Sequence, residues 1–436
     1  MRWRDMEVSM LTPMCDTLCA PGRDGMVFAK NSDRPVGEVQ IAVPFGRRPT
    51  AGCILRTQYL SIGDTGAHAA LLSCPTWLWG AEHGVNEFGV AIGNERVATR
   101  HNASQAPPRL IGMDMVRLGL ERARSAEEAV DVLINLLTTH GQGGIADATH
   151  QEAYDSSFLL ADSRNAFVLD TSGTDFAAAP FPRGTAISNQ LSVGSDWTLG
   201  SVDLEPGDDF SRFGDPESVT DSAQVRLSAS RAFLASQSAT SEGLAPAAVA
   251  AHLRDHGNGP WGAPGSYERA QPPATTRGDD GAGASGGGAA GSRGAASSRA
   301  AAGICMHLPG RSVTAASMIA VLPGDVAAGA PVRAYVALGN PCVSIYVPAF
   351  PRTAAGPPPF VPLELSSEAL WRAADALRER VEADPDAIGA IREVLDPVED
   401  ELWFEAGDIV ETPDRWADVA GQWGSRALEA LRSCAI

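Results

Sequence analysis

Two short apolar runs near the start of the chain flank a turn rich in Pro, Gly and Asp, a pattern typical of a β-hairpin. The runs cover 15–20 and 26–31, with the turn at 21–25. Because the runs are equally long, their far ends are predicted to lie side by side. The hairpin would therefore gather the thiol of Cys15, the ammonium of Lys30 and the carboxylate of Asp33.

The rest of the chain mixes strand-like and helix-like periodicity. Further strands are predicted at 53–95, 157–161, 166–170, 186–189, 312–322 and 332–345. Helices are predicted at 108–140, 224–256 and from 366 onward, with Pro385 as a stop. Ser125 with Glu128 forms a capping box, and Gly141 ends the helix that follows it. The pattern by itself indicates an α+β protein.

Composition divides the chain. At 263–303 Gly, Ala, Ser, Pro and Arg alternate without apolar periodicity, which predicts a disordered insertion. A strand-like sequence pattern resumes at 304. The insertion is therefore expected to interrupt a single domain of 15–352 and not to separate two domains. A segment of 1–14 precedes this domain, and a helical extension of 364–436 follows it. The extension is interpreted as packing or dimer surface, which leaves a homo-oligomer open.

The net charge and the cysteine content indicate which classes of partner are excluded and which cellular compartment is expected. The 436 residues carry a net charge of −19, which argues against nucleic acid or an anionic membrane as partner. The seven cysteines are odd in number and lack a Cys-x-x-Cys spacing, so they are interpreted as free thiols in a reducing compartment. Residues 1–14 show no signal-peptide pattern and no stretch approaches ~20 apolar residues, so a cytoplasmic location is expected.

Lys30 is the only lysine, against thirty-three arginines. Its position beside Cys15 and Asp33 favours a chemical role that a planar guanidinium does not serve. The alternative is drift in an arginine-biased chain.

Several motifs give the chain a family resemblance. Cys15-Asp16-Thr17 followed by 30–35 resembles the opening of the secernin and bacterial dipeptidase family of N-terminal nucleophile hydrolases. Further matching segments follow in the same order, at 77–82, 86–95, 187–192, 304–307 and 339–342. The resemblance covers about 15 to 350 and is weak in the C-terminal tail.

The resemblance implies a four-layer αββα sandwich and a nucleophile at the first residue of the mature chain. Cys15 would attack, and its own α-amino group would carry the proton. Residues 1–14 must then be absent, either because translation starts at Met14 or because a propeptide is cleaved. Asp33 would orient the amine, Lys30 would lower the pKa of the thiol and pair with Asp33, and Asn189 would hold the oxyanion.

The remaining site predictions concern the substrate. Asn94, Trp79, Glu82 and Arg34 are expected to bind it, although core aromatics, a surface carboxylate and a turn asparagine are open alternatives. Related hydrolases carry an arginine in the region of 224–256. Arg231 is the nearer match there, but a solvated helix face is favoured for both Arg226 and Arg231. No metal or cofactor is expected.

The function predicted from the resemblance is that of a cysteine-dependent dipeptidase, which hydrolyses short peptides through an acyl-enzyme. A catalytically silent secernin-like scaffold and an amidase for non-peptide acyl amides stay open. Two other motifs are rejected. The serine-elbow match at 283–287 lies in low-complexity sequence. His252 and His256 have the spacing of a zinc-protease helix, but Leu253 occupies the place of its catalytic glutamate.

Overall fold

The computed structural model describes residues 15–50, 52–216, 221–238, 243–257, 303–324, 331–351, 361–411 and 416–435. The predictions for 1–14 and for nearly all of the insertion at 263–303 lie outside these ranges.

Two antiparallel sheets dominate the described part of the chain. The seven-stranded sheet has the order β12-β1-β2-β15-β16-β17, and β14 also pairs with β15. Its strands are β1 (Asp16–Gly22), β2 (Gly25–Pro35), β12 (Thr185–Ile187), β14 (His307–Leu308), β15 (Ser312–Pro323), β16 (Arg333–Leu338) and β17 (Val347–Ala349).

The eight-stranded sheet has the order β13-β11-β10-β9-β8-β7-β6-β3. Its strands are β3 (Gln40–Phe45), β6 (Ala70–Pro75), β7 (His83–Asn86), β8 (Ala91–Val97), β9 (Asp155–Ala161), β10 (Ala166–Ser172), β11 (Asp175–Pro180) and β13 (Leu199–Gly200). A separate pair is formed by β4 (Ile54–Arg56) and β5 (Ser61–Gly63).

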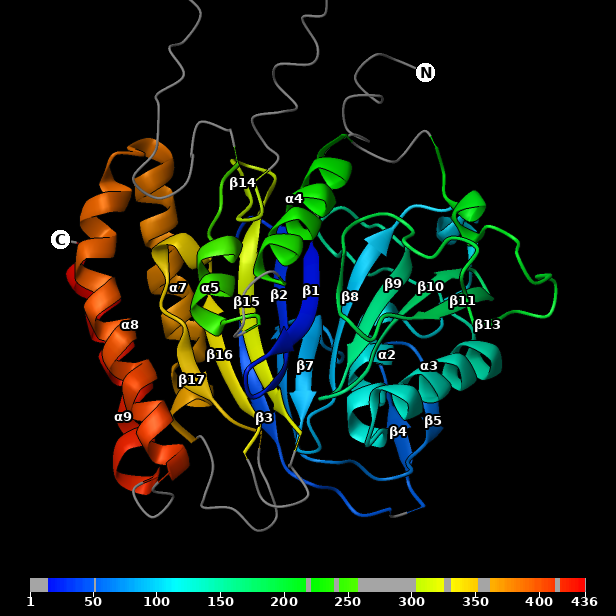
Figure 1. The fold of residues 1–436 in the computed structure, drawn as a ribbon, viewed down its shortest axis with the longest axis horizontal. Helices are drawn as coiled ribbons and strands as arrows, with labels where there is room; N and C mark the ends of the chain where they lie inside the picture. The colour runs from blue at the N-terminus through cyan, green and yellow to red at the C-terminus, as the bar shows by residue number, and fades with distance from the viewer. Residues whose placement is uncertain are drawn as a thin grey trace, which may run out of the picture.

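The two sheets pack face to face, with helices on both outer faces. Strand β1 contacts β8 and β9, and β3 contacts β15 and β16. Helices α2 (Gly112–Arg122) and α3 (Ala126–His140) cover the eight-stranded sheet, while α4 (Asp221–Gln237) and α5 (Pro246–Leu253) cover the seven-stranded sheet (Figure 1). The predicted α+β fold, a four-layer αββα sandwich, is confirmed.

The C-terminal helices lie along one side of the sandwich, in orange to red in Figure 1. They are α7 (Val361–Ala383), α8 (Ala387–Glu411) and α9 (Trp416–Ser433). Helix α7 packs against β3 and β16 and buries Leu370, Ala374, Leu377 and Val381. Within the described residues, no helix is long and apolar enough to cross a membrane.

The first hairpin confirms the predicted pairing with a tighter turn. Asp16 lies opposite Asn31, and Gly22 lies opposite Gly25. Strand β2 also continues to Pro35 because β15 pairs with it on its other edge. Asp33 is therefore a strand residue in the middle of a sheet.

Other local predictions are partly confirmed. The Ser125 side chain caps α3 by accepting the N–H of Glu128, and Gly141 ends α3 at φ 72°. The strand predicted at 332–345 is wrong in its second half, where 341–343 forms the 3-10 helix η4 (Pro341–Val343). Gly339 at φ 80° and the ring of Pro341 interrupt the strand there. Two further 3-10 helices are η1 (Ala103–Gln105) and η2 (Phe210–Phe213).

Candidate functional site

Strand β2 carries an unbroken run of buried polar residues from Lys30 to Arg34. Because side chains alternate along a strand, this run supplies polar groups to both faces of the sheet. We call Thr17, Lys30 and Glu95, which meet between the two sheets, the inner group. We call Asp16, Asp33 and Arg226, which meet beneath α4, the outer group.

Cys15 lies at the end of β1, where both groups come close. Its backbone N–H donates to Asn189 Oδ1 at 2.7 Å, and its carbonyl accepts from Ser188 Oγ at 3.2 Å. Its Sγ accepts the backbone N–H of Asp33 at 3.3 Å. Burial raises the pKa of the Cys15 thiol, although Lys30 opposes that rise. The thiol is therefore protonated at neutral pH and needs a base before it can attack.

Lys30 is held by the inner group. Its Nζ donates to Asn94 O at 2.7 Å and to both carboxylate oxygens of Glu95 at 3.2 Å. Burial lowers the pKa of Lys30, but Cys15, Glu95 and Glu82 outweigh it and the net shift is upward. Lys30 is therefore charged beside the thiol, and its effect on the reactivity of the thiol stays a prediction. The predicted pairing of Lys30 with Asp33 is wrong, because residues 30 and 33 point to opposite faces of β2.

Asp33 is held by the outer group. Thr314 Oγ1 donates to its Oδ1 at 2.6 Å, and Arg226 Nη2 donates to its Oδ2 at 2.8 Å. The same guanidinium also contacts Asp16. Burial raises the pKa of Asp33 to about 7, against the opposing effects of Arg226 and Thr314. The single N–H of the Cys15 peptide group donates to Asn189, so the role of Asp33 in orienting a free Cys15 amine stays a prediction.

Arg226 is a site residue that the sequence prediction missed. Its side chain is 0% exposed, whereas Arg231 on the same helix is exposed, as expected. A signal was present in the sequence, because Arg226 shares its helix face with the buried residues Ala223, Leu227, Ser230 and Leu234. The preference for a solvated face was wrong for Arg226.

Asn189 follows β12 and lies against Cys15, as the resemblance implies. Its Oδ1 accepts from Cys15, and its Nδ2 donates to Arg96 O at 2.9 Å. The two contacts fix the orientation of the amide, since a backbone N–H only donates and a carbonyl only accepts. The role of Asn189 as an oxyanion donor stays a prediction.

A small cavity opens beside the thiol. Its volume is about 10 Å³, space for roughly one water. It is lined by Cys15, Asp33, Arg34, Glu82, Arg96, Asp147 and Tyr154. Arg34 donates from Nη1 to Glu82 at 3.0 Å and from Nε to Glu38 at 2.5 Å. The structure thus brings two predicted substrate residues, Arg34 and Glu82, to Cys15.

Arg96, Asp147 and Tyr154 were not predicted to belong to the site. The guanidinium of Arg96 lies over the ring of Tyr154 at 5.8 Å. Both residues also line a second hollow of about 510 Å³, together with Arg100, His101, Asp155 and Asp215 among others. Arg96 and Tyr154 therefore stand between the thiol cavity and a space of ligand size.

Two predicted substrate residues lie away from the thiol cavity. Trp79 packs under the guanidinium of Arg117 at 4.1 Å and does not line the cavity. Asn94 is buried, with its Nδ2 on Met113 Sδ at 3.6 Å and its carbonyl on Lys30. In this structure Asn94 positions Lys30 and Trp79 is part of the packing.

Within the described residues, no group around Cys15 has the arrangement of a metal site. The one cluster that does is formed by His256, Cys305, His307 and Cys342.

No known protein-family model matches the chain. Partial structural matches include penicillin V acylase from Agrobacterium tumefaciens, at 17% identity and TM-score 0.28, over 39% of this chain and 51% of that one. An ortholog of N-acylethanolamine-hydrolyzing acid amidase from Caenorhabditis elegans matches at 13% identity and TM-score 0.28, over 41% of this chain and 71% of that one.

A third match is the R18L variant of conjugated bile acid hydrolase from Clostridium perfringens, at 12% identity and TM-score 0.33, over 53% of this chain and 75% of that one. The match to the acylase thus spans about half of that enzyme's length. At TM-scores this low, the matches carry no weight for the activity or the substrate of the present chain.

Proposed function

We propose that the chain is an amide hydrolase that cleaves dipeptides with Cys15 as an N-terminal nucleophile. The observation that carries the proposal is the placement of one thiol and one backbone nitrogen of Cys15 between two buried charged groups. Buried ions cost stability unless they are well paired, so a fold keeps so many of them at one place chiefly where chemistry needs them.

The proposed reaction begins after residues 1–14 are absent, so that Cys15 has a free α-amino group. That amine, with an ordinary pKa near 8, takes the thiol proton as Sγ bonds to the substrate carbonyl carbon. The carbonyl oxygen becomes an oxyanion, and the protonated amine then gives its proton to the leaving nitrogen. Water attacks the resulting thioester, the amine again carries the proton, and the acid leaves.

The two buried groups would support these steps differently. Lys30 stabilises the developing thiolate by its charge. Asp33 donates its backbone N–H to Sγ, and Arg226 and Thr314 hold its carboxylate in the outer group. Asn189 accepts from Cys15 N through Oδ1. Its Nδ2 would donate the hydrogen bond that stabilises the oxyanion.

The hollow beyond Arg96 and Tyr154 supports a zwitterionic substrate. It is lined by the cations Arg96 and Arg100 and by the carboxylates Asp155 and Asp215. Opposite charges at one site suit the carboxylate and the ammonium of a dipeptide. An acyl amide with a long apolar chain would find no comparable apolar lining there, so the dipeptide is favoured over the non-peptide amide.

The test combines processing with turnover. We expect purified protein to begin at Cys15 by intact mass and N-terminal sequencing, and to release amino acids from a dipeptide panel. Cys15→Ala should reduce turnover to background, whereas Cys19→Ala, at another buried cysteine of the hairpin, should retain it.

A wild-type chain that keeps residue 14 and hydrolyses neither dipeptides nor acyl amides would overturn the proposal and favour the scaffold alternative. Turnover of acyl amides alone would keep the nucleophile and reject the dipeptide substrate.

A further inference from the structure

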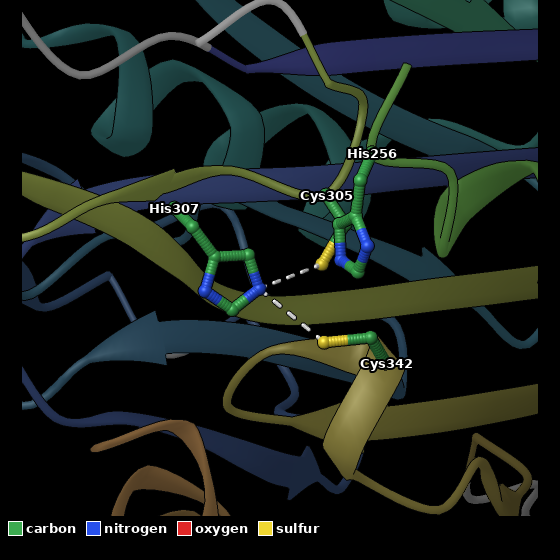
Figure 2. A group of neighbouring side chains, drawn as sticks. All are labelled: His256, Cys305, His307 and Cys342. Carbon is green, nitrogen blue, oxygen red and sulfur yellow. Dashed lines mark hydrogen bonds between the residues drawn. The ribbon is translucent and has the colours of Figure 1, made fainter. Parts of the chain in front are cut away.

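A cluster of two cysteines and two histidines lies apart from the residues that surround Cys15. His256 follows α5, Cys305 and His307 flank the start of β14, and Cys342 lies in η4. All four are buried, and one ligand atom of each lies within 4.8 Å of the others. Figure 2 shows the four side chains converging from three segments of the chain. We propose that they bind one zinc ion in a structural site.

The distances fit a tetrahedral ion. His307 Nε2 lies 3.7 Å from Cys305 Sγ and 3.3 Å from Cys342 Sγ, the two contacts dashed in Figure 2. With Zn–S near 2.3 Å and Zn–N near 2.0–2.1 Å, a tetrahedron places neighbouring sulfur and nitrogen ligands about 3.5 Å apart. The side chains therefore need only small shifts to enclose an ion.

The ligand set also selects the ion. Thiolate and imidazole together in a tetrahedral arrangement favour zinc over magnesium, calcium or manganese, which prefer oxygen. Two thiolates and one Zn²⁺ sum to zero charge, so the occupied site is inexpensive to bury. Binding would release the two thiol protons to solvent. Four protein ligands leave no open position for a substrate, which makes the site structural.

Neighbouring residues supply the outer contacts that metal ligands usually have. His307 Nδ1 lies 3.2 Å from Glu382 Oε1, so a carboxylate orients the imidazole with Nε2 toward the ion. Asn340 Nδ2 donates to Cys305 Sγ at 3.6 Å. Arg378 binds the other oxygen of Glu382 at 2.6 Å. A carboxylate–histidine pair and an N–H donor to sulfur are the arrangement expected around a zinc thiolate.

Strand β2 holds the ligand segments together. Asn31 Nδ2 donates to Leu253 O and to Ile304 O, both at 2.9 Å, and Cys305 N donates to Asp255 O at 2.9 Å. The backbones that lead into His256 and Cys305 are thus already side by side. An ion here would link the part of the chain just before residue 258 to the part just after residue 302.

Two hydrogen bonds through Thr314 connect the cluster to Asp33 of the outer group. Met306 N, between two proposed ligands, donates to Thr314 Oγ1 at 2.8 Å, and that hydroxyl donates to Asp33 Oδ1 at 2.6 Å. An ion that fixes Cys305 and His307 would fix this hydroxyl as well. The proposal departs from the sequence expectation that no metal is bound, since the four ligands lack any recognisable spacing.

Metal content gives the first test, and it does not depend on activity. Full-length protein purified without chelator from zinc-supplemented culture should contain about one zinc per chain by mass spectrometry of the metal. Cys342→Ala should lose it. Cys74→Ala, at a buried cysteine in β6, is the matched control and should keep it.

Cobalt spectroscopy uses only the wild type, so it tests the proposal even if the Cys342→Ala variant fails to fold. Chelator-treated, reduced protein titrated with Co²⁺ should show thiolate-to-cobalt absorption and the visible bands of a tetrahedral site, both displaced by one equivalent of Zn²⁺. Wild type without these bands and without zinc would overturn the proposal, as would a Cys305–Cys342 disulfide in protein isolated under non-reducing conditions.

Discussion

At the scale of single residues, the site depends on which buried charge faces which partner. Arg226 pairs with both Asp16 and Asp33 beneath α4, while Lys30 pairs with Glu95 between the sheets. Each of these side chains is almost fully enclosed. Removing one partner of a buried pair leaves an uncompensated charge, which costs more than the pair itself contributes.

Arg226→Ala is therefore expected to lower the free energy of unfolding by about 3–5 kcal/mol, because two aspartates lose their shared cation. Arg231→Ala on the same helix is the control and should change stability by less than about 0.5 kcal/mol. Urea denaturation of both variants measures the difference. Equal, small effects of the two substitutions would mean that Arg226 does not pair with Asp16 and Asp33 in solution.

The sequence predicted the identities of the central residues better than their contacts. Cys15, Lys30 and Asp33 could be found from the hairpin and its motif, but the partner of Lys30 could not. Pairing depends on which face of β2 each side chain occupies and on which strand lies opposite. Those are tertiary facts, and Glu95 lies more than sixty positions away along the chain.

At the scale of elements, the first hairpin depends on its tight turn. Gly25 has φ +130°, and a Cβ at this position would lie 2.0 Å from Leu322 O of the neighbouring strand. Only glycine can therefore bring β2 this close to β15 at the turn. The hairpin places Cys15, so this glycine acts on the site from the opposite end of β1.

Gly25→Ala is expected to destabilise the protein by about 2–5 kcal/mol, since strain in the backbone adds to a steric clash. Gly37→Ala tests the strain alone, because Gly37 has φ +85° with nothing within 4 Å of its Cβ position. It should cost about 1–2 kcal/mol. Thermal or urea unfolding separates the two, and equal losses would contradict the close approach.

Elements with a local signal were predicted well, and those fixed by contacts were not. The cap at Ser125 and the hairpin of β9 with β10 follow from short-range rules. The extension of β2 to Pro35 does not, because the predicted run ends at 31 and the strand continues only by pairing with β15. The 3-10 helix η4 likewise replaced a predicted strand.

At the scale of the molecule, burial of acids gives the fold an unusual dependence on pH. Burial raises the pKa of Asp33 and Asp114 to about 7 and of Asp170 to about 6. In the unfolded chain these groups titrate near 4. Between those values the folded state binds more protons than the unfolded state, so these groups make stability fall as pH rises.

These acids should therefore lower the urea midpoint from pH 5 to 8, while His83 and His252, whose pKa values burial lowers, act in the opposite direction. Asp114→Asn should remove one of these contributions, because asparagine has no group that titrates in this range. Its amide oxygen can accept from only one of the two N–H groups, Ile111 N–H and Gln58 N–H, that the carboxylate accepts, so some loss of stability at every pH is also expected. Asp114 lies in α2, so the change leaves Cys15 and its neighbours intact. The same pH dependence in Asp114→Asn and in wild type would show that Asp114 is ionised at little cost.

The layers of the sandwich were predictable from resemblance and mixed periodicity, whereas the cluster of His256, Cys305, His307 and Cys342 was not. Its ligands come from three segments, and no two cysteines have a familiar spacing. Cysteine counting detects pairs that are close in sequence. It does not detect ligands that sheet pairing and the packing of α5 bring together.

The polar run of β2 has a consequence for how this chain can change over generations. Lys30 depends on Glu95 in the other sheet, Arg34 depends on Glu82 just before β7, and Asp33 depends on Arg226 on α4. A single replacement leaves the partner as an unpaired buried charge. An inserted residue turns the side chains of β2 that follow it to the opposite face of the sheet. Among relatives of this chain, these positions should vary together or not at all, as a set of coupled columns in an alignment.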